Sequence, residues 1–96
     1  MANLCNNTFQ AYTEDSANVE VIKNFFDNWS GSDYEESDNQ IDVYFDSNWD
    51  FPKKEMDNLF ELIPNKANIY MRCLSVEYGN LYHALWVCDE DGWREV

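Results

Sequence analysis

Basic residues are scarce in this chain. Its 96 residues include 6 Lys and Arg against 19 Asp and Glu, which gives a formal net charge of -13. A surface this negative repels DNA, RNA and anionic lipid, and it attracts cations and basic protein surfaces through long-range interactions that salt weakens. We therefore expect no direct contact with nucleic acid or membrane, and a basic partner.

Cysteine and histidine are also few. The three cysteines, Cys5, Cys73 and Cys88, form no CxxC pair, and their odd number favours a reduced compartment over a disulfide framework. His83 is the only imidazole, and the chain has no Gly-rich phosphate loop, nucleophile elbow or His-carboxylate motif. The first hydrophobic run is too short for a signal peptide or a membrane span. These absences predict a cytoplasmic protein that is not an enzyme and uses no cofactor or metal.

Apolar residues are sufficient for one core. Hydrophobic residues make up 45% of the chain and aromatic residues 17%, unlike the composition of disordered chains. A chain of this length supports one modest core. We expect residues 1–96 to form a single acidic domain.

Periodicity and turn residues predict the elements. We expect an α+β fold that is ferredoxin-like, with two helices on one face of a four-stranded, mainly antiparallel sheet in the order βαβαββ. The predicted elements are a strand over residues 7–13, a helix over 16–29, a solvated loop over 30–40, a strand over 41–46, a helix that starts at Pro52 with Asp50 as its cap and ends at Pro64, strands over 68–78 and 81–88, and a short last strand after Asp91-Gly92.

The segment VEYGNLYHALWV, residues 76–87, has a turn signal between two nearly apolar runs. If Gly79-Asn80 is a two-residue loop, Val76 opposes His83 and Leu74 opposes Leu85. The face that carries small side chains suits close helix packing, so we place it in the core; it comprises Met71, Cys73, Ala84 and Trp86.

The other face of this hairpin is a possible apolar interface. Two helices on one side of a sheet cannot cover it, and contiguous exposed apolar surface marks an interface or a covered groove. The chain's own tail or acidic loop, a second copy of the chain, or a partner could provide the cover. The residues concerned are Leu74, Val76, Tyr78, Leu81, Leu85 and Val87.

Three short motifs carry a resemblance: MANLCNN at residues 1–7, FDSNWDFP at 45–52 and SVEYG at 75–79. They resemble the YubB-like ferredoxin-like domain family of small, mostly uncharacterised phage, plasmid and bacterial proteins. Those chains often begin Met-x-Asn-Trp-Cys-x-Asn, whereas this one has Leu4 in place of the tryptophan, and its acidic loop is shorter. The resemblance implies a ferredoxin-like α+β fold and a mobile-element origin, and it brings no catalytic residues.

Acidic side chains are dense between residues 33 and 46, and we expect Tyr44 to serve as an aromatic anchor among them. Carboxylates on a rigid domain can imitate a phosphate backbone and bind the Lys and Arg that nucleic-acid channels use for phosphates. A generic acidic surface that confers solubility is the alternative. The candidate partner-binding residues are Asp33, Glu35, Glu36, Asp38, Asp42, Tyr44 and Asp46.

Ion-binding patterns are weak. Residues 46–57 space their oxygen ligands like a calcium loop, but Phe51 stands where the sharp turn requires Gly. Asp89-Glu90-Asp91-Gly92 could hold a divalent ion, and a solvated turn explains it more simply. A zinc site is disfavoured because His83 points away from the face that Cys73 and Cys88 share.

These observations favour a non-enzymatic acidic binding protein of mobile-element origin. It would act as a nucleic-acid mimic that inhibits a basic host nucleic-acid-binding or defence complex, such as a CRISPR effector, in the host cytoplasm. One alternative is a structural homodimer joined through the apolar hairpin face. Another is a small-ligand-binding domain or enzyme around His83 and Tyr78.

Overall fold

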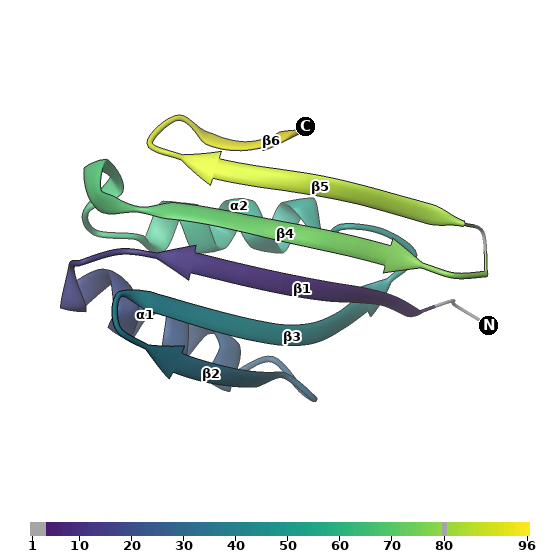
Figure 1. Ribbon diagram of the computed structural model, residues 1–96, viewed down its shortest axis with the longest axis horizontal. Coiled ribbons are helices and arrows are strands. Elements are labelled where there is room, and N and C mark those ends of the chain that lie inside the picture. Colours follow the sequence, from purple (N-terminus) through teal and green to yellow (C-terminus); the bar gives the residue numbers. More distant parts are fainter. Residues whose placement is uncertain (1–3, 80) are drawn as a thin grey trace.

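Six strands form one antiparallel sheet in the computed structural model, which describes residues 4–79 and 81–96. The elements in chain order are β1 (Leu4–Tyr12), α1 (Ser16–Asp27), β2 (Asp33–Ser37), β3 (Gln40–Asn48), α2 (Lys53–Leu62), a short 3-10 helix (Lys66–Asn68), β4 (Tyr70–Glu77), β5 (Tyr82–Asp89) and β6 (Gly92–Glu95). The order across the sheet is β2-β3-β1-β4-β5-β6. Both helices lie behind the sheet in Figure 1, so one face is covered and the other is open.

The four-stranded ferredoxin-like sheet in βαβαββ order is wrong as a prediction for this chain. The sheet has six strands, because residues 33–37, expected within a loop, form the edge strand β2, and β6 lies at the opposite edge. Within β2 only Tyr34 packs against the core, and the other four side chains are exposed. An edge strand that buries one side chain shows no apolar alternation, and periodicity therefore missed it.

Helix α1 begins at Ser16, as predicted, and ends at Asp27, two residues before the predicted end. Asp15 is the N-cap, and its side chain accepts a hydrogen bond from the Ala17 N–H at 2.8 Å. Ile22 and Phe26 are buried against the sheet, and the Phe26 ring lies 5.1 Å from that of Phe9 at the centre of β1. The core therefore fills the layer between the helices and the sheet.

The predicted cap of α2 is wrong. Pro52 itself holds the N-cap position, and its carbonyl accepts a hydrogen bond from the Met56 N–H at 2.9 Å. Asp50 thus lies outside the helix, which has no side-chain cap. Met56 and Leu59 are buried as their spacing predicts. Within residues 4–79 and 81–96, neither helix has the length and apolar character needed to span a membrane.

The predicted register of the last long hairpin is confirmed. Val76 pairs with His83 and Leu74 with Leu85. Strand β4 ends at Glu77, and the Leu81 N–H donates to the Tyr78 carbonyl at 3.4 Å across the turn. The predicted Gly79-Asn80 turn includes Asn80, which lies outside the described residues.

The predicted faces of this hairpin are confirmed too. Met71, Cys73 and Ala84 are buried beneath the helices. Trp86 is partly buried on the same side, and its ring stacks on that of Phe51 at 4.5 Å. The register therefore leaves the alternate side chains of β4 and β5 on the open face.

Candidate protein-binding face

The open face carries the alternate side chains of every strand, and one row of them crosses most of the sheet. Asp33 on β2 lies opposite Tyr44 on β3, and Tyr44 lies opposite Thr8 on β1. Thr8 in turn lies opposite Leu74 on β4, which pairs with Leu85 on β5. The row therefore runs from the acidic edge of the sheet to its apolar strands.

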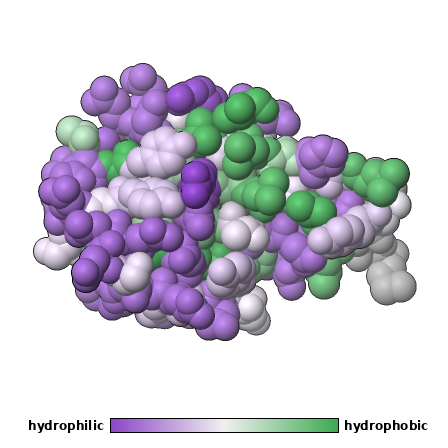
Figure 2. All heavy atoms as spheres, in the orientation of Figure 1, coloured by the Kyte–Doolittle hydropathy of each residue, from purple (hydrophilic) through white to green (hydrophobic). Residues whose placement is uncertain are grey.

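Figure 2 shows a similar division of the face. Apolar side chains gather over the part of β4 and β5 nearer their turn, and hydrophilic side chains cover β2, β3 and the other end of β4 and β5. The two regions that the sequence predicts separately are thus neighbours on one surface.

The acidic region follows β2 and β3. We call it the acidic strip: Asp33, Glu35, Asp42 and Asp46, arranged around Tyr44. Glu35 lies directly opposite Asp42, and the Tyr44 side chain is 50% exposed. The ion pairs within residues 4–79 and 81–96 are Lys23–Glu36, Lys53–Asp57 and Arg94–Asp89, so none involves the acidic strip.

Two predicted partner-binding residues lie elsewhere. Glu36 alternates with its neighbours to the covered side, where its carboxylate pairs with Lys23 of α1 at 3.4 Å. Asp38 occupies the turn between β2 and β3. Residues 30–40 were predicted to be a loop, and a loop does not place consecutive side chains on opposite faces as a strand does. The prediction therefore could not distinguish Glu36 and Asp38 from the residues on the open face.

The apolar region lies on β4 and β5. We call it the apolar patch: Leu74, Val76 and Leu85 on the strands, with Tyr78 and Leu81 at the hairpin turn. Leu74 is 45% exposed and Leu85 is 39% exposed, so neither the tail nor residues 30–40 cover them. Val87, also expected on this face, is buried, with Arg72 and Arg94 as its cross-strand neighbours.

The sequence reasoning missed several exposed apolar residues, among them Leu4 and Val96. Leu4 lies on the open side of β1. An extension of the predicted first strand back to Leu4 would have placed it there, because side chains alternate with buried Cys5 along the strand. Val96 follows β6, and its N–H donates to the Leu85 carbonyl at 2.9 Å. No local pattern could place Val96, because its position depends on pairing at the edge of the sheet.

A shallow hollow opens beside Tyr44. Its volume is about 350 Å³, and it lies where β1, β2 and β3 meet. Carboxylates contribute to the lining together with short polar side chains. The lining residues include Asn6, Thr8, Gly31, Asp33, Tyr44 and Asp46.

The histidine and the cysteines that were considered for a catalytic or zinc site lie on different faces of the sheet. His83 is exposed on the open face opposite Val76, whereas Cys73 and Cys88 are buried on the covered side. Burial raises the pKa of each of these two thiols to about 12, so both stay protonated at neutral pH. In the part of the chain that the structure describes, no three His, Cys, Asp or Glu side chains are grouped to hold a metal ion.

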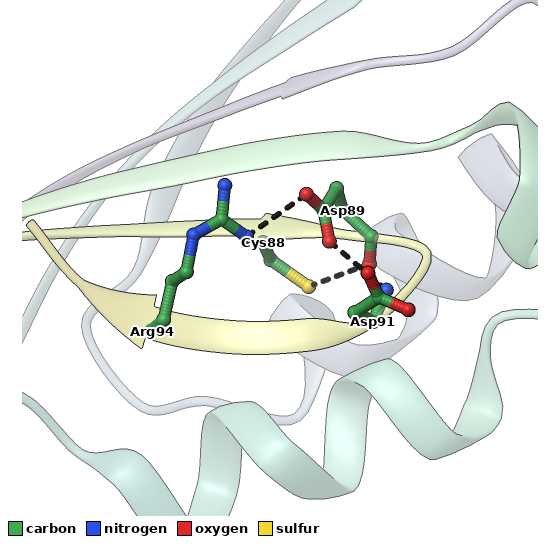
Figure 3. A network of polar contacts seen from close by, with 4 residues as sticks. All are labelled: Cys88, Asp89, Asp91 and Arg94. Carbon is green, nitrogen blue, oxygen red and sulfur yellow. Dashed lines mark hydrogen bonds and ion pairs between the residues drawn. The ribbon is translucent and has the colours of Figure 1, made fainter.

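The turn between β5 and β6 is organised by Asp89 (Figure 3). One carboxylate oxygen accepts the Asp91 N–H at 2.9 Å, and the other pairs with the Arg94 guanidinium at 2.9 Å. The Asp91 N–H and then Arg94 lower the pKa of Asp89, because both favour its charged form. Both oxygens of Asp89 therefore have partners in the turn itself.

The chain matches no protein-family model, no curated protein and no solved structure. The resemblance to the YubB-like family stays a prediction that rests on its three motifs.

Proposed function

We propose that this protein is a non-enzymatic binding protein whose acidic strip occupies a basic, nucleic-acid-binding surface of a host protein. The observation that supports this most is the position of Glu35 directly opposite Asp42 on the open face. Like charges in this arrangement destabilise a sheet by roughly 0.2–1 kcal/mol. A basic partner would remove that repulsion on binding.

The strip has the features of a phosphate mimic. Asp42 and Asp46 lie on one face of β3, about 13 Å apart at the usual rise of a strand. Tyr44 lies between them as a half-exposed aromatic anchor. Lys and Arg side chains bind carboxylates and phosphates through the same charge-assisted hydrogen bonds. A mobile-element origin, a cytoplasmic location in the host and a CRISPR effector as target belong to this proposal.

Affinity capture from a bacterial lysate tests the proposal. The bait is compared with a strip variant that combines Asp33→Asn, Asp42→Asn and Asp46→Asn. Its matched control combines Glu20→Gln, Glu61→Gln and Glu90→Gln, exposed residues outside the strip, and changes the charge equally. We expect the wild type and the control to retain a nucleic-acid-binding protein that double-stranded DNA displaces, and the strip variant to lose it.

Two results would remove the proposal: equal capture by the strip variant, or a captured protein that added DNA does not displace. Glu36→Gln is an internal control, because Glu36 pairs with Lys23 on the covered side. Its capture should equal that of the wild type.

A structural homodimer is the second candidate function. It is favoured by the exposure of Tyr78 and Leu81, 72% and 83%, next to Leu74 and Leu85 on the same hairpin. Burying such a patch in a two-fold interface would remove apolar surface from water. The net charge of -13 on each copy opposes this association.

A further inference from the structure

We infer that the partner presents a protein segment with an arginine that enters the hollow beside Tyr44 and an apolar side chain that packs on Leu74 and Leu85. This inference rests on the proposed function and defines what the basic surface must contain. It joins the acidic strip and the apolar patch into one docking surface for one segment.

The hollow has the chemistry of an arginine site. Asp33 and Asp46 line it together with the Tyr44 ring. A guanidinium group has five N–H donors in a plane, which suits two carboxylates, and it stacks on an aromatic ring. A lysine ammonium is a compact, strongly hydrated charge that matches this arrangement less well.

The two arginines of this chain do not fill that role. Arg72 is on the open face, but its guanidinium is held by Gln10 and by the Tyr12 hydroxyl, 3.1 Å away, and it lies over the Tyr12 ring. Arg94 pairs with Asp89 at the β5–β6 turn. An arginine that enters the hollow must therefore come from the partner.

The apolar side chain follows from the row that crosses the sheet. Tyr44 and Leu74 both lie opposite Thr8, one on each side of β1. Two strand spacings separate them, or about 10 Å. Thr8 is shorter than either neighbour, so a bound segment can reach from the Tyr44 ring to Leu74 without a bulky side chain between them.

Because the acidic strip and the apolar patch lie side by side, the surface suits a protein partner better than a nucleic acid or a membrane. A nucleic acid or an anionic membrane would be repelled by the strip. A second copy would bring another chain of net charge -13, and the guanidinium of Arg72 on its open face is already hydrogen-bonded to Gln10 and Tyr12. A basic protein segment with one apolar side chain can bind the acidic strip through its charge and the apolar patch through that side chain.

Amide chemical shifts of the intact protein, measured with a short peptide, test the inference. The probe is an acetylated and amidated hexapeptide, Gly-Arg-Ser-Gly-Leu-Gly; the arginine and leucine are about 10 Å apart along the chain, and the glycine between them lets both side chains turn to the same side. Two matched peptides replace the arginine by lysine or the leucine by serine. We expect shifts at Asp33, Tyr44, Asp46, Leu74 and Leu85, and a loss of affinity of about threefold or more with either replacement.

Protein variants test the two ends of the surface separately. Leu74→Thr with Leu85→Thr should abolish the preference for leucine, and Tyr44→Leu should abolish the preference for arginine over lysine. These side chains are exposed, and an unchanged amide spectrum away from the site verifies the fold. Leu62→Gln, an exposed change on α2, is the matched control and should alter neither preference.

Shifts confined to other surfaces, no shifts at all, equal affinity for the three peptides, or dimerisation through Leu74 and Leu85 would overturn the inference. If lysate capture still depends on the acidic strip while the peptides show no preference, the inference fails and the proposed function stands. If the peptides show the preference but capture does not depend on the strip, the proposed target class fails and a peptide-binding face remains.

Discussion

Glu35 on β2 lies directly opposite Asp42 on β3, so two carboxylates face the same open side of the sheet. The described contacts of Asp42 include a hydrogen bond from the Gln40 amide at 2.8 Å but no cation. Acidic residues on an edge strand also hinder pairing with other chains. The pair therefore costs stability while it disfavours edge-to-edge aggregation, and under the proposed function a basic partner would remove the repulsion.

Glu35→Gln should stabilise the isolated protein. We expect the free energy of unfolding to rise by a few tenths to about 1 kcal/mol, because the repulsion with Asp42 is lost. Urea unfolding at low salt measures this, and the gain should shrink in about 1 M salt. Glu95→Gln, an exposed change on the other edge strand opposite Trp86, is the matched control. A gain no larger than that of the control would contradict the prediction.

Asn18→Leu should destabilise the fold by on the order of 3 kcal/mol. Asn18 is buried on α1, and its side-chain NH2 donates to the carbonyls of Asn65 and Asn68 at 2.9 and 3.0 Å. Its carbonyl oxygen accepts the Asn65 N–H at 3.0 Å. Leucine would leave the Asn65 N–H without its partner and would remove one donor from each carbonyl, which keep only the Asn68 N–H and the Thr13 hydroxyl. The measurement is the urea midpoint, with exposed Asn24→Leu on the same helix as control; equal effects of the two changes would refute the prediction.

Stability should fall as the pH rises above 9. Burial raises the pKa of Cys73 and Cys88 from 9.0 to about 12, so in this range the unfolded thiols lose protons that the folded thiols keep. The unfolded state then binds fewer protons, and the free energy of unfolding drops by about 1 kcal/mol per thiol from pH 9 to pH 10.

A variant with Cys73→Ala and Cys88→Ala controls for the other groups that titrate in that range. Its stability should depend less steeply on pH between 9 and 10 than that of the wild type. Equal slopes in urea unfolding would show that these thiols are not responsible.

Leu74→Asp or Leu85→Asp should split the homodimer if that second function holds. Each side chain is exposed on the apolar patch, and a carboxylate there would be buried without a partner in a two-fold interface. Light scattering at high concentration gives the mass. Neutralising the acidic strip should leave the dimer intact, and a wild-type protein that is already a monomer removes this function.

Local patterns were enough for several elements. The spacing of Ile22 and Phe26 predicted α1, and the alternation of Ile41, Val43 and Phe45 predicted the strand that became β3. In each case the spacing of apolar residues within one short segment is enough to predict whether that segment is a helix or a strand. Strand β2 gave no such signal, because Tyr34 alone packs against the core.

The candidate face needed more than periodicity. Five of the seven predicted partner-binding residues share the open face, while Glu36 pairs with Lys23 behind the sheet and Asp38 lies in a turn. This separation follows from β2 being a strand, which the sequence did not indicate. Val96 likewise joined the exposed apolar side chains only through pairing at the edge of the sheet.

By itself the sequence determined the charge, both helices, and the register of the β4–β5 hairpin, in which Val76 meets His83. These depend on composition, on spacing within a segment, or on a short turn between neighbouring strands. Only the tertiary structure decided that Tyr44 and Leu74 lie on either side of Thr8. Strand neighbours that are distant in sequence are selected by packing of the whole core, and so the acidic strip and the apolar patch meet on one face.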